Sequence, residues 1–99
     1  SGEDAFEIGE IRLDPKKHEV TVHEDVVNLT LKEYELLKRL MKNSNIVLTR
    51  DQLLEDIWGY DFDGETRTVD VHVRTLRQKL GDAGEQIETV RGVGYRMSR

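Results

Sequence analysis

The sequence predicts an α+β domain in which short antiparallel strands come first, three helices follow and a β-hairpin comes last. The helices are indicated by two capping-box patterns, at residues 30–33 and 49–52, and by an apolar stripe at helical spacing over residues 66–80. The hairpin is indicated by the glycine-rich segment 91–94 between two strand-like runs. With 99 residues, the chain is long enough for one domain with its own hydrophobic core.

The first thirty residues alternate between apolar and polar side chains in a way that predicts short strands. The apolar positions before the turn signal Asp14-Pro15 are Phe6, Ile8, Ile11 and Leu13. Further strand-like runs follow at residues 18–22 and 26–29. Between these two runs, Glu24-Asp25 is the expected hairpin turn.

The first two helices are predicted to begin at their capping boxes. The Thr30 hydroxyl can accept a hydrogen bond from the Glu33 amide while the Glu33 carboxylate accepts one from the Thr30 amide, and Thr49 begins the second box in the same way. The first helix should end at the Asn-Ser-Asn segment 43–45. The second should end at Gly59, because glycine commonly follows the last turn of a helix.

The third segment could be read as a helix or as a strand, because residues 69–73 alternate between apolar and polar side chains as a strand does. A strand would have to place Leu76 and Leu80 on the face opposite to Val73. A helix, which turns by about 100° per residue, brings all the large aliphatic side chains except one valine into a single sector. These core-facing positions are Val69, Val73, Leu76 and Leu80. We therefore predict a helix over residues 66–80.

The opposite face of this helix has the chemistry that reading a DNA groove requires. It carries Arg67, Val71, Arg74 and Gln78, with Asp70 and Thr75 beside them. Arginine can donate to phosphate or guanine, glutamine and threonine can pair with base edges, and a valine or threonine methyl can pack on the thymine methyl. A solvated helix face with one exposed valine is the alternative. Thr66 is the expected cap at the start of the helix and Gly81 at its end.

The C-terminal segment completes a recognisable order of elements. After a break at residues 81–84, two strands are expected at 86–90 and 95–98, around Arg91-Gly92-Val93-Gly94, where glycines can adopt positive φ. Three helices followed by such a hairpin is the order of a winged helix-turn-helix. In that fold the third helix enters the major groove and the hairpin, or wing, reaches an adjacent minor groove.

The charge distribution is uneven along the chain. The formal net charge of −5 argues at first against a nucleic-acid partner, since phosphate binding depends on cationic side chains. Residues 1–66 carry 8 Lys and Arg against 16 Asp and Glu, a net of −8, whereas residues 67–99 carry 7 against 4, a net of +3. One face of the domain is therefore expected to meet an anionic partner.

Several classes of function find little support in the sequence. There is no cysteine, so neither a disulfide framework nor a thiolate metal site is available, and a cytoplasmic location is expected. No apolar run approaches the length of a membrane span, so no membrane partner is expected. The histidines His18, His23 and His72 lie apart, and no phosphate-binding loop or catalytic motif is present. We therefore expect no enzyme activity, no cofactor and no metal.

Two long motifs stand in the C-terminal third, Arg67-Thr68-Val69-Asp70-Val71-His72-Val73-Arg74 and Thr89-Val90-Arg91-Gly92-Val93-Gly94-Tyr95-Arg96. Both closely resemble the effector domain of OmpR/PhoB-type response regulators of bacterial two-component systems. The resemblance covers nearly the whole chain, including the start of the first helix at residues 29–37. It implies a winged helix-turn-helix with an N-terminal four-stranded antiparallel sheet, spanning residues 1–99. It also implies sequence-specific binding of double-stranded DNA in transcription regulation, with helix 66–80 in the major groove and wing 86–98 at the minor groove.

The resemblance further implies roles for individual residues. The family's phosphate-contacting positions are matched by Arg67, His72 and Arg74, and its base-facing positions by Val71 and Thr75. In the wing, Thr89 matches a residue on the DNA backbone and Arg91 matches the arginine that enters the minor groove. The full set of expected DNA-binding residues is Arg67, Thr68, Val71, His72, Arg74, Thr75, Gln78, Thr89 and Arg91. Thr75 departs from the family pattern, because several relatives carry a longer basic residue there.

The loop at residues 59–65 matches the segment that touches RNA polymerase in relatives. Its expected polymerase-contacting residues are Tyr60, Asp61, Phe62, Asp63 and Glu65. An ordinary loop whose aromatic side chains cover the core remains the alternative, and Trp58 is expected to fill the core.

Relatives bind direct-repeat operators as tandem dimers, driven by a phosphorylated receiver domain. No receiver is expected in this chain, so we expect a monomer in solution that meets a second copy of itself on DNA. The rival function is a winged-helix protein-interaction module that does not bind DNA, which the acidic total charge favours. Salt-dependent DNA binding through the basic face would discriminate between the two functions.

Overall fold

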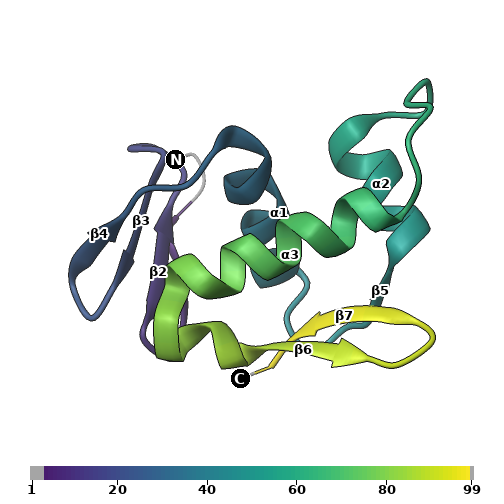
Figure 1. The fold of residues 1–99 in the computed structure, drawn as a ribbon. Coiled ribbons are helices and arrows are strands. Elements are labelled where there is room, and N and C mark those ends of the chain that lie inside the picture. The colour runs from purple at the N-terminus through teal and green to yellow at the C-terminus, as the bar shows by residue number, and fades with distance from the viewer. Residues whose placement is uncertain (1–3, 99) are drawn as a thin grey trace.

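The computed structural model describes residues 4–98 and shows an α+β fold with a small sheet at each end of the chain (Figure 1). The elements are β1 (Phe6–Ile8), β2 (Ile11–Asp14), β3 (Glu19–Val22), β4 (Asp25–Val27), α1 (Leu31–Lys42), β5 (Leu48–Thr49), α2 (Arg50–Trp58), α3 (Arg67–Leu80), the 3-10 helix η1 (Gly81–Gln86), β6 (Ile87–Val90) and β7 (Gly94–Met97). Buried side chains from both sheets and from all three α-helices form one hydrophobic core. Helix α3 crosses in front of α1, with the β6–β7 hairpin below it (Figure 1).

The N-terminal sheet has the predicted four antiparallel strands, in the order β1-β2-β3-β4. Its strands alternate as expected, and Ile11, Leu13 and Val20 turn inward onto the core. The β3–β4 turn was expected at Glu24-Asp25 but lies one residue earlier. His23 and Glu24 both have positive φ there, and Asp25 already pairs with Val22.

Both predicted capping boxes are confirmed. In α1 the Thr30 side chain accepts from the Glu33 amide, and the Glu33 carboxylate accepts from the Thr30 amide. Thr49 makes the corresponding pair of bonds at the start of α2. Helix α1 gives way at Asn43, and α2 ends at Gly59, whose φ of 97° is unfavourable for residues with a side chain.

The third segment is a helix, and its predicted core stripe is confirmed. All four stripe residues, Val69, Val73, Leu76 and Leu80, are buried. The expected cap at Thr66 is wrong: its backbone is itself in the right-handed helical region, and its side chain makes no capping hydrogen bond. The helix instead starts through backbone bonds from the Thr68 amide to the Glu65 carbonyl and from the Val69 amide to the Thr66 carbonyl. Gly81, with φ of 64°, ends the helix as predicted.

The C-terminal hairpin is present and belongs to a three-stranded sheet with the order β5-β7-β6. We call the segment Ile87–Met97 the wing. Strand β5 was not predicted, and it pairs with the far end of the chain through Leu48 and Tyr95. At the tip of the wing, Gly92 has the positive φ that was expected. Gly94 does not have a positive φ. Glycine is needed there because β7 lies close to β5, and a Cβ at position 94 would lie 2.0 Å from the Leu48 carbonyl oxygen.

Candidate nucleic-acid interface

The outward face of α3 matches the helical prediction side chain by side chain. Arg67, Val71, Arg74 and Gln78 are all exposed. Val71 is 51% exposed although it stands between two buried valines, so it contributes nothing to the core. Two cationic side chains, one amide and one aliphatic side chain are therefore available to a partner on this face.

The flank of α3 that faces α1 meets a buried carboxylate of that helix. Glu33 is 3% exposed and receives hydrogen bonds from the Thr30 amide, the Lys79 ammonium at 2.6 Å and the Thr75 hydroxyl at 2.6 Å. Burial alone would raise the pKa of Glu33, but the bonds from Lys79, Thr75 and Thr30 outweigh it and lower the pKa from 4.5 to about 2. We call Glu33, Thr75 and Lys79 the inner cluster; it fixes the middle of α3 to the first turn of α1.

Three of the expected DNA-binding residues on this flank are only partly exposed. Thr75 is half-buried, with its hydroxyl directed at Glu33. His72 is half-buried as well, with Nδ1 2.8 Å from the Thr68 carbonyl oxygen and its ring edge-on to Trp58 at 4.8 Å. Because a carbonyl only accepts, Nδ1 of His72 carries the proton. Thr68 is half-buried too, so these three residues form the shoulder of the outward face.

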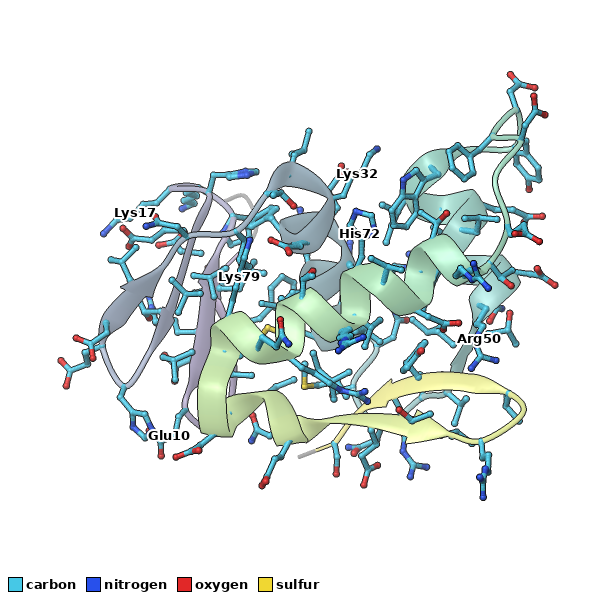
Figure 2. All side chains as sticks on the ribbon, viewed as in Figure 1. Glu10, Lys17, Lys32, Arg50, His72 and Lys79 are labelled. Atoms are coloured by element: carbon cyan, nitrogen blue, oxygen red, sulfur yellow. The ribbon has the colours of Figure 1, made fainter. Side chains whose placement is uncertain are left out.

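The other flank of α3 faces the wing through a second carboxylate. Asp70 Oδ1 accepts from Arg50 Nε at 2.7 Å and from the Tyr95 hydroxyl at 2.5 Å. We call Arg50, Asp70 and Tyr95 the wing cluster. Burial would raise the pKa of Asp70, yet the bonds from Tyr95 and Arg50 lower it, and burial together with the bond to Asp70 raises the pKa of Tyr95. Figure 2 shows Arg50 and Lys79 near opposite ends of α3.

Arg77 makes a second connection between α3 and the wing. Its guanidinium donates to the Ile87 carbonyl at 2.6 and 3.0 Å and to the Thr89 hydroxyl at 2.7 Å, and it lies 5.5 Å from the centre of the Tyr95 ring. Thr89 is exposed, and because its oxygen accepts from Arg77, its own proton is left to donate to a partner. Arg91 is exposed at the wing tip.

The loop between α2 and α3 is exposed and acidic. All five of its expected contact residues, Tyr60, Asp61, Phe62, Asp63 and Glu65, are exposed. Tyr60 is 86% exposed, whereas the Phe62 ring lies 6.2 Å from Trp58. Trp58 is partly buried and packs against the core, as expected. Phe62 is therefore near the partly buried Trp58, while Tyr60 is almost fully exposed.

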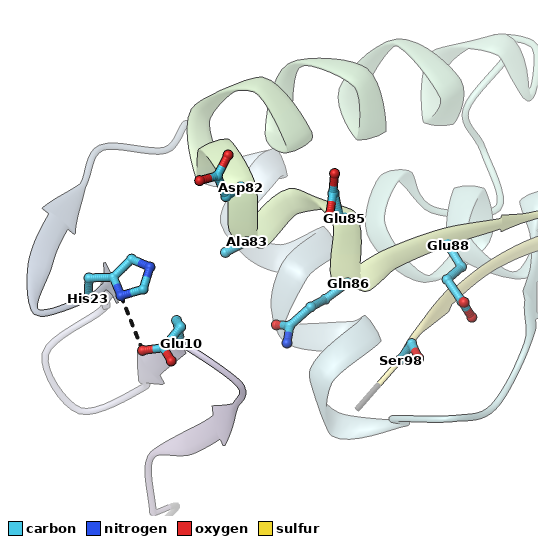
Figure 3. Close-up of a pocket in the computed structure, with 8 residues that line it drawn as sticks. All are labelled: Glu10, His23, Asp82, Ala83, Glu85, Gln86, Glu88 and Ser98. Atoms are coloured by element: carbon cyan, nitrogen blue, oxygen red, sulfur yellow. Dashed lines mark ion pairs between the residues drawn. The ribbon is translucent and has the colours of Figure 1, made fainter.

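A pocket lies beyond the C-terminal end of α3, between the N-terminal sheet and η1 (Figure 3). Half of its lining residues are acidic; the lining comprises Glu10, His23, Asp82, Ala83, Glu85, Gln86, Glu88 and Ser98. Glu10 and His23 form an ion pair at 3.2 Å if the histidine is protonated (Figure 3). Within residues 4–98, no group of three His, Asp or Glu side chains is placed to hold a metal ion. The carboxylates here would repel phosphate, so this end of the molecule marks a limit of the basic face.

The residues that orient the interface were not predicted as a group. Glu33 was identified only as a capping residue, but its partners Thr75 and Lys79 are 42 and 46 positions away. Arg50 and Tyr95 meet Asp70 across 20 and 25 positions. The only signal in the sequence was that Asp70, Thr75 and Lys79 are polar residues beside the apolar stripe of α3. This signal did not identify the partner that each would meet.

The comparisons with known proteins agree with this geometry. Residues 23–97 match the family described as "Transcriptional regulatory protein, C terminal". The chain belongs to this family. Sensory transduction protein RegX3 of Mycobacterium tuberculosis is 46% identical over 95 residues, which cover 93% of this chain but 42% of RegX3. This effector domain therefore corresponds to less than half of that relative.

Solved structures of response regulators and of their DNA-binding domains share the fold of this chain. The response regulator DrrB of Thermotoga maritima, an OmpR/PhoB homologue, superimposes with a TM-score of 0.88 at 28% identity, covering 98% of this chain and 45% of DrrB. The DNA-binding domain of Klebsiella pneumoniae RstA, solved in complex with the RstA box, superimposes with a TM-score of 0.85 at 31% identity, covering 97% of this chain and 98% of that one. The chain is thus an effector domain of the OmpR/PhoB type with a winged helix-turn-helix fold. Its family is one of transcriptional regulators and not generally of enzymes. No helix within residues 4–98 is long and apolar enough to cross a membrane.

Proposed function

We propose that this effector domain binds double-stranded DNA sequence-specifically and so regulates transcription in the cytoplasm, as the output part of a two-component response regulator. The observation that carries the proposal is the outward face of α3, where Arg67 and Arg74 flank an exposed Val71 that the core does not use. A helix of this kind fits the major groove, where phosphates and base edges lie side by side. The RstA domain that superimposes on this chain was solved with DNA bound.

In this arrangement the side chains divide into positioning and reading groups. Arg67 and Arg74 contact phosphates, and Val71 and Gln78 face bases. Thr68 and His72 contact the backbone from the shoulder of α3, with the imidazole oriented by the Thr68 carbonyl. Thr75, the third residue of this shoulder, lies on the side of α3 that faces the bases.

The wing contacts the neighbouring part of the duplex. The Thr89 hydroxyl, oriented by Arg77, donates to a phosphate, and Arg91 at the wing tip enters the minor groove. The wing cluster and the Arg77 bonds fix the position of Thr89 and Arg91 relative to α3. Helix α3 and the wing therefore form one surface that contacts the major and the minor groove together.

The proposal is tested by the salt dependence of binding to duplexes selected from a random library. Arg74→Ala should weaken binding across all sequences and reduce the slope of log affinity against log salt by about one unit, because one phosphate contact is lost. Arg12→Ala is the matched control: Arg12 is exposed on β2, and its change should leave the slope as it is. If the domain bound no duplex, or did so without salt dependence, the rival function of a protein-interaction module would be favoured.

The minor-groove contact has a test of its own. A narrow A·T-rich minor groove attracts arginine, so Arg91→Ala should weaken binding more on A·T-flanked than on G·C-flanked sites. Equal losses on both would contradict insertion of Arg91.

We further propose that the exposed loop, with Tyr60 at its surface, contacts RNA polymerase, and that two copies bind direct-repeat sites in tandem. Tyr60→Ala should then reduce activated transcription in vitro while leaving DNA affinity unchanged. A duplex with two direct half-sites should bind two copies more tightly than two separate half-sites do. Loss of activation only together with loss of DNA binding would argue against the polymerase contact.

A further inference from the structure

Thr75 occupies a base-facing shoulder of α3, but its polar atom is already engaged. The hydroxyl lies 2.6 Å from Glu33 Oε2 and 3.1 Å from the His72 carbonyl oxygen. Both of these oxygens are acceptors, so the single proton of the hydroxyl is donated within the protein. The Thr75 hydroxyl is therefore directed at Glu33 of α1 and at its own helix. The methyl group is the remaining part of this partly buried side chain that a base could meet.

The group that holds the hydroxyl is itself fixed. Glu33 is buried, and its carboxylate also receives the Thr30 amide at 2.9 Å and the Lys79 ammonium at 2.6 Å. With a pKa of about 2, this carboxylate stays ionised at neutral pH and remains an acceptor. Withdrawing the Thr75 hydroxyl to bind a base would leave one oxygen of a buried charge without its donor, which is unfavourable.

The methyl end of Thr75 has an apolar neighbour on the same face. Val71 lies one turn earlier, and side chains four positions apart on a helix have Cβ atoms about 5–6 Å apart. Together Val71 and Thr75 form an apolar strip beside Arg67 and Arg74. Only one base edge in the major groove carries an exposed methyl group, that of thymine.

We propose that Thr75 is a specificity-determining residue that reads DNA through its methyl group and, with Val71, selects thymine at two nearby positions of the operator. The inference rests on the proposed DNA binding and specifies what α3 reads. It assigns to Thr75 no hydrogen bond donated to a guanine or adenine acceptor, because its only proton is bound to Glu33.

The test uses duplexes selected from a random library by the wild-type domain and resynthesised with deoxyuridine in place of single thymines. This exchange removes one methyl group and leaves every base-pair hydrogen bond in place. At two nearby positions we expect binding to weaken about fourfold each, the factor that corresponds to burial of one methyl group. Wild-type binding that is indifferent to every such exchange would overturn the inference.

Two substitutions of Thr75 separate the methyl from the hydroxyl. Thr75→Ser keeps the donor to Glu33 and lacks the methyl, so it should lose the thymine preference at one position while the preference due to Val71 persists. Thr75→Val keeps a methyl and lacks the hydroxyl, so it should keep both preferences even if its melting temperature falls. The reverse pattern, with preference retained by Ser and lost by Val, would identify the hydroxyl as the reader and overturn the inference.

Failure of the inference can be told apart from failure of the proposed function. If no duplex is enriched and none is bound, DNA binding itself is refuted. If duplexes are bound with salt dependence but without sensitivity to thymine methyl groups, DNA binding stands and only the role of Thr75 is refuted.

Discussion

The two flanks of α3 are each held by a carboxylate, but the two carboxylates lie in different surroundings. In the inner cluster, Glu33 has a side chain that is 4% exposed and meets two side-chain donors and one backbone amide. In the wing cluster, Asp70 has a side chain that is 40% exposed and meets Arg50 and Tyr95. The first joins helix to helix inside the domain, while the second joins the helix to the wing at the surface.

This difference suggests that the two clusters have different roles, one in stability and the other in the position of the wing. A buried, hydrogen-bonded carboxylate is strongly destabilising to remove, because its donors lose their acceptor. For Glu33 these donors are the Thr30 amide, the partly buried Thr75 hydroxyl and the Lys79 ammonium, whose side chain is 39% exposed. A half-exposed pair is screened by solvent and contributes little to the free energy of unfolding. The inner cluster should therefore govern stability, and the wing cluster should govern how firmly the wing and α3 keep their relative position.

The largest effect is expected from Glu33→Ala. It removes the capping box and the acceptor of Thr75 and Lys79 together, and should reduce the free energy of unfolding by roughly 3 to 4 kcal/mol. Urea unfolding measures this change. Glu35→Ala is the control on the same helix: Glu35 is half-exposed, lies 3.8 Å from Lys32, and its removal should cost less than about 1 kcal/mol. Similar losses for both variants would contradict the comparison.

Acid should act on the same carboxylate. The pKa of Glu33 is lowered from 4.5 to about 2 in the folded protein, so its contribution is complete above pH 4.5 and is lost as the pH falls toward 2. Between about pH 5 and pH 2.5 this loss is on the order of 2 kcal/mol. Glu33→Gln, which cannot titrate, should show a correspondingly flatter decline in unfolding free energy over this range. A decline as steep as that of the wild type would assign the acid sensitivity to other groups.

A smaller effect is expected in the wing cluster. Tyr95→Phe removes only the hydroxyl that donates to Asp70 and should cost about 1 kcal/mol of stability. The loosened wing should also increase the rate of amide hydrogen exchange in β6 and β7. Tyr60→Phe, at an exposed position, is the matched control and should change neither quantity. If exchange in the wing stayed unchanged in Tyr95→Phe, the wing cluster would have no coupling role.

The smallest effect on stability is expected at the outward face. Val71→Ala should shift the free energy of unfolding by less than about 0.5 kcal/mol, because this side chain packs against nothing in the core. It should nevertheless alter the sequences selected from a random duplex library. A large loss of stability with an unchanged sequence preference would place Val71 in the core instead.

The parts of the fold that depend on short-range patterns were predictable. The capping boxes at Thr30 and Thr49 form because donor and acceptor are three residues apart, and the α3 stripe follows from helical periodicity alone. Strand β5 was missed because two residues give no periodicity and their partner in β7 lies more than forty positions away. The cap at Thr66 was misassigned because residue type alone does not fix backbone conformation.

The candidate site was predictable in its exposure and not in its internal contacts. Helical periodicity placed Arg67, Val71 and Arg74 outward, and all three are exposed. The same periodicity left Thr75 beside them without showing that its hydroxyl is bound to Glu33. That contact depends on how α1 crosses α3, which is a tertiary property with no trace in the local sequence.

The position of β7 has a consequence for how the protein is made. This strand is the middle strand of its sheet, yet it follows every other described element in the chain. A ribosome releases β5 and β6 first, and they cannot share a sheet until Gly94–Met97 emerges between them. Tyr95, which completes the wing cluster, arrives with that strand. During synthesis, α3 is thus made before β7 can fix the wing against it, and the helix and the wing reach their final relative position only once this strand has paired.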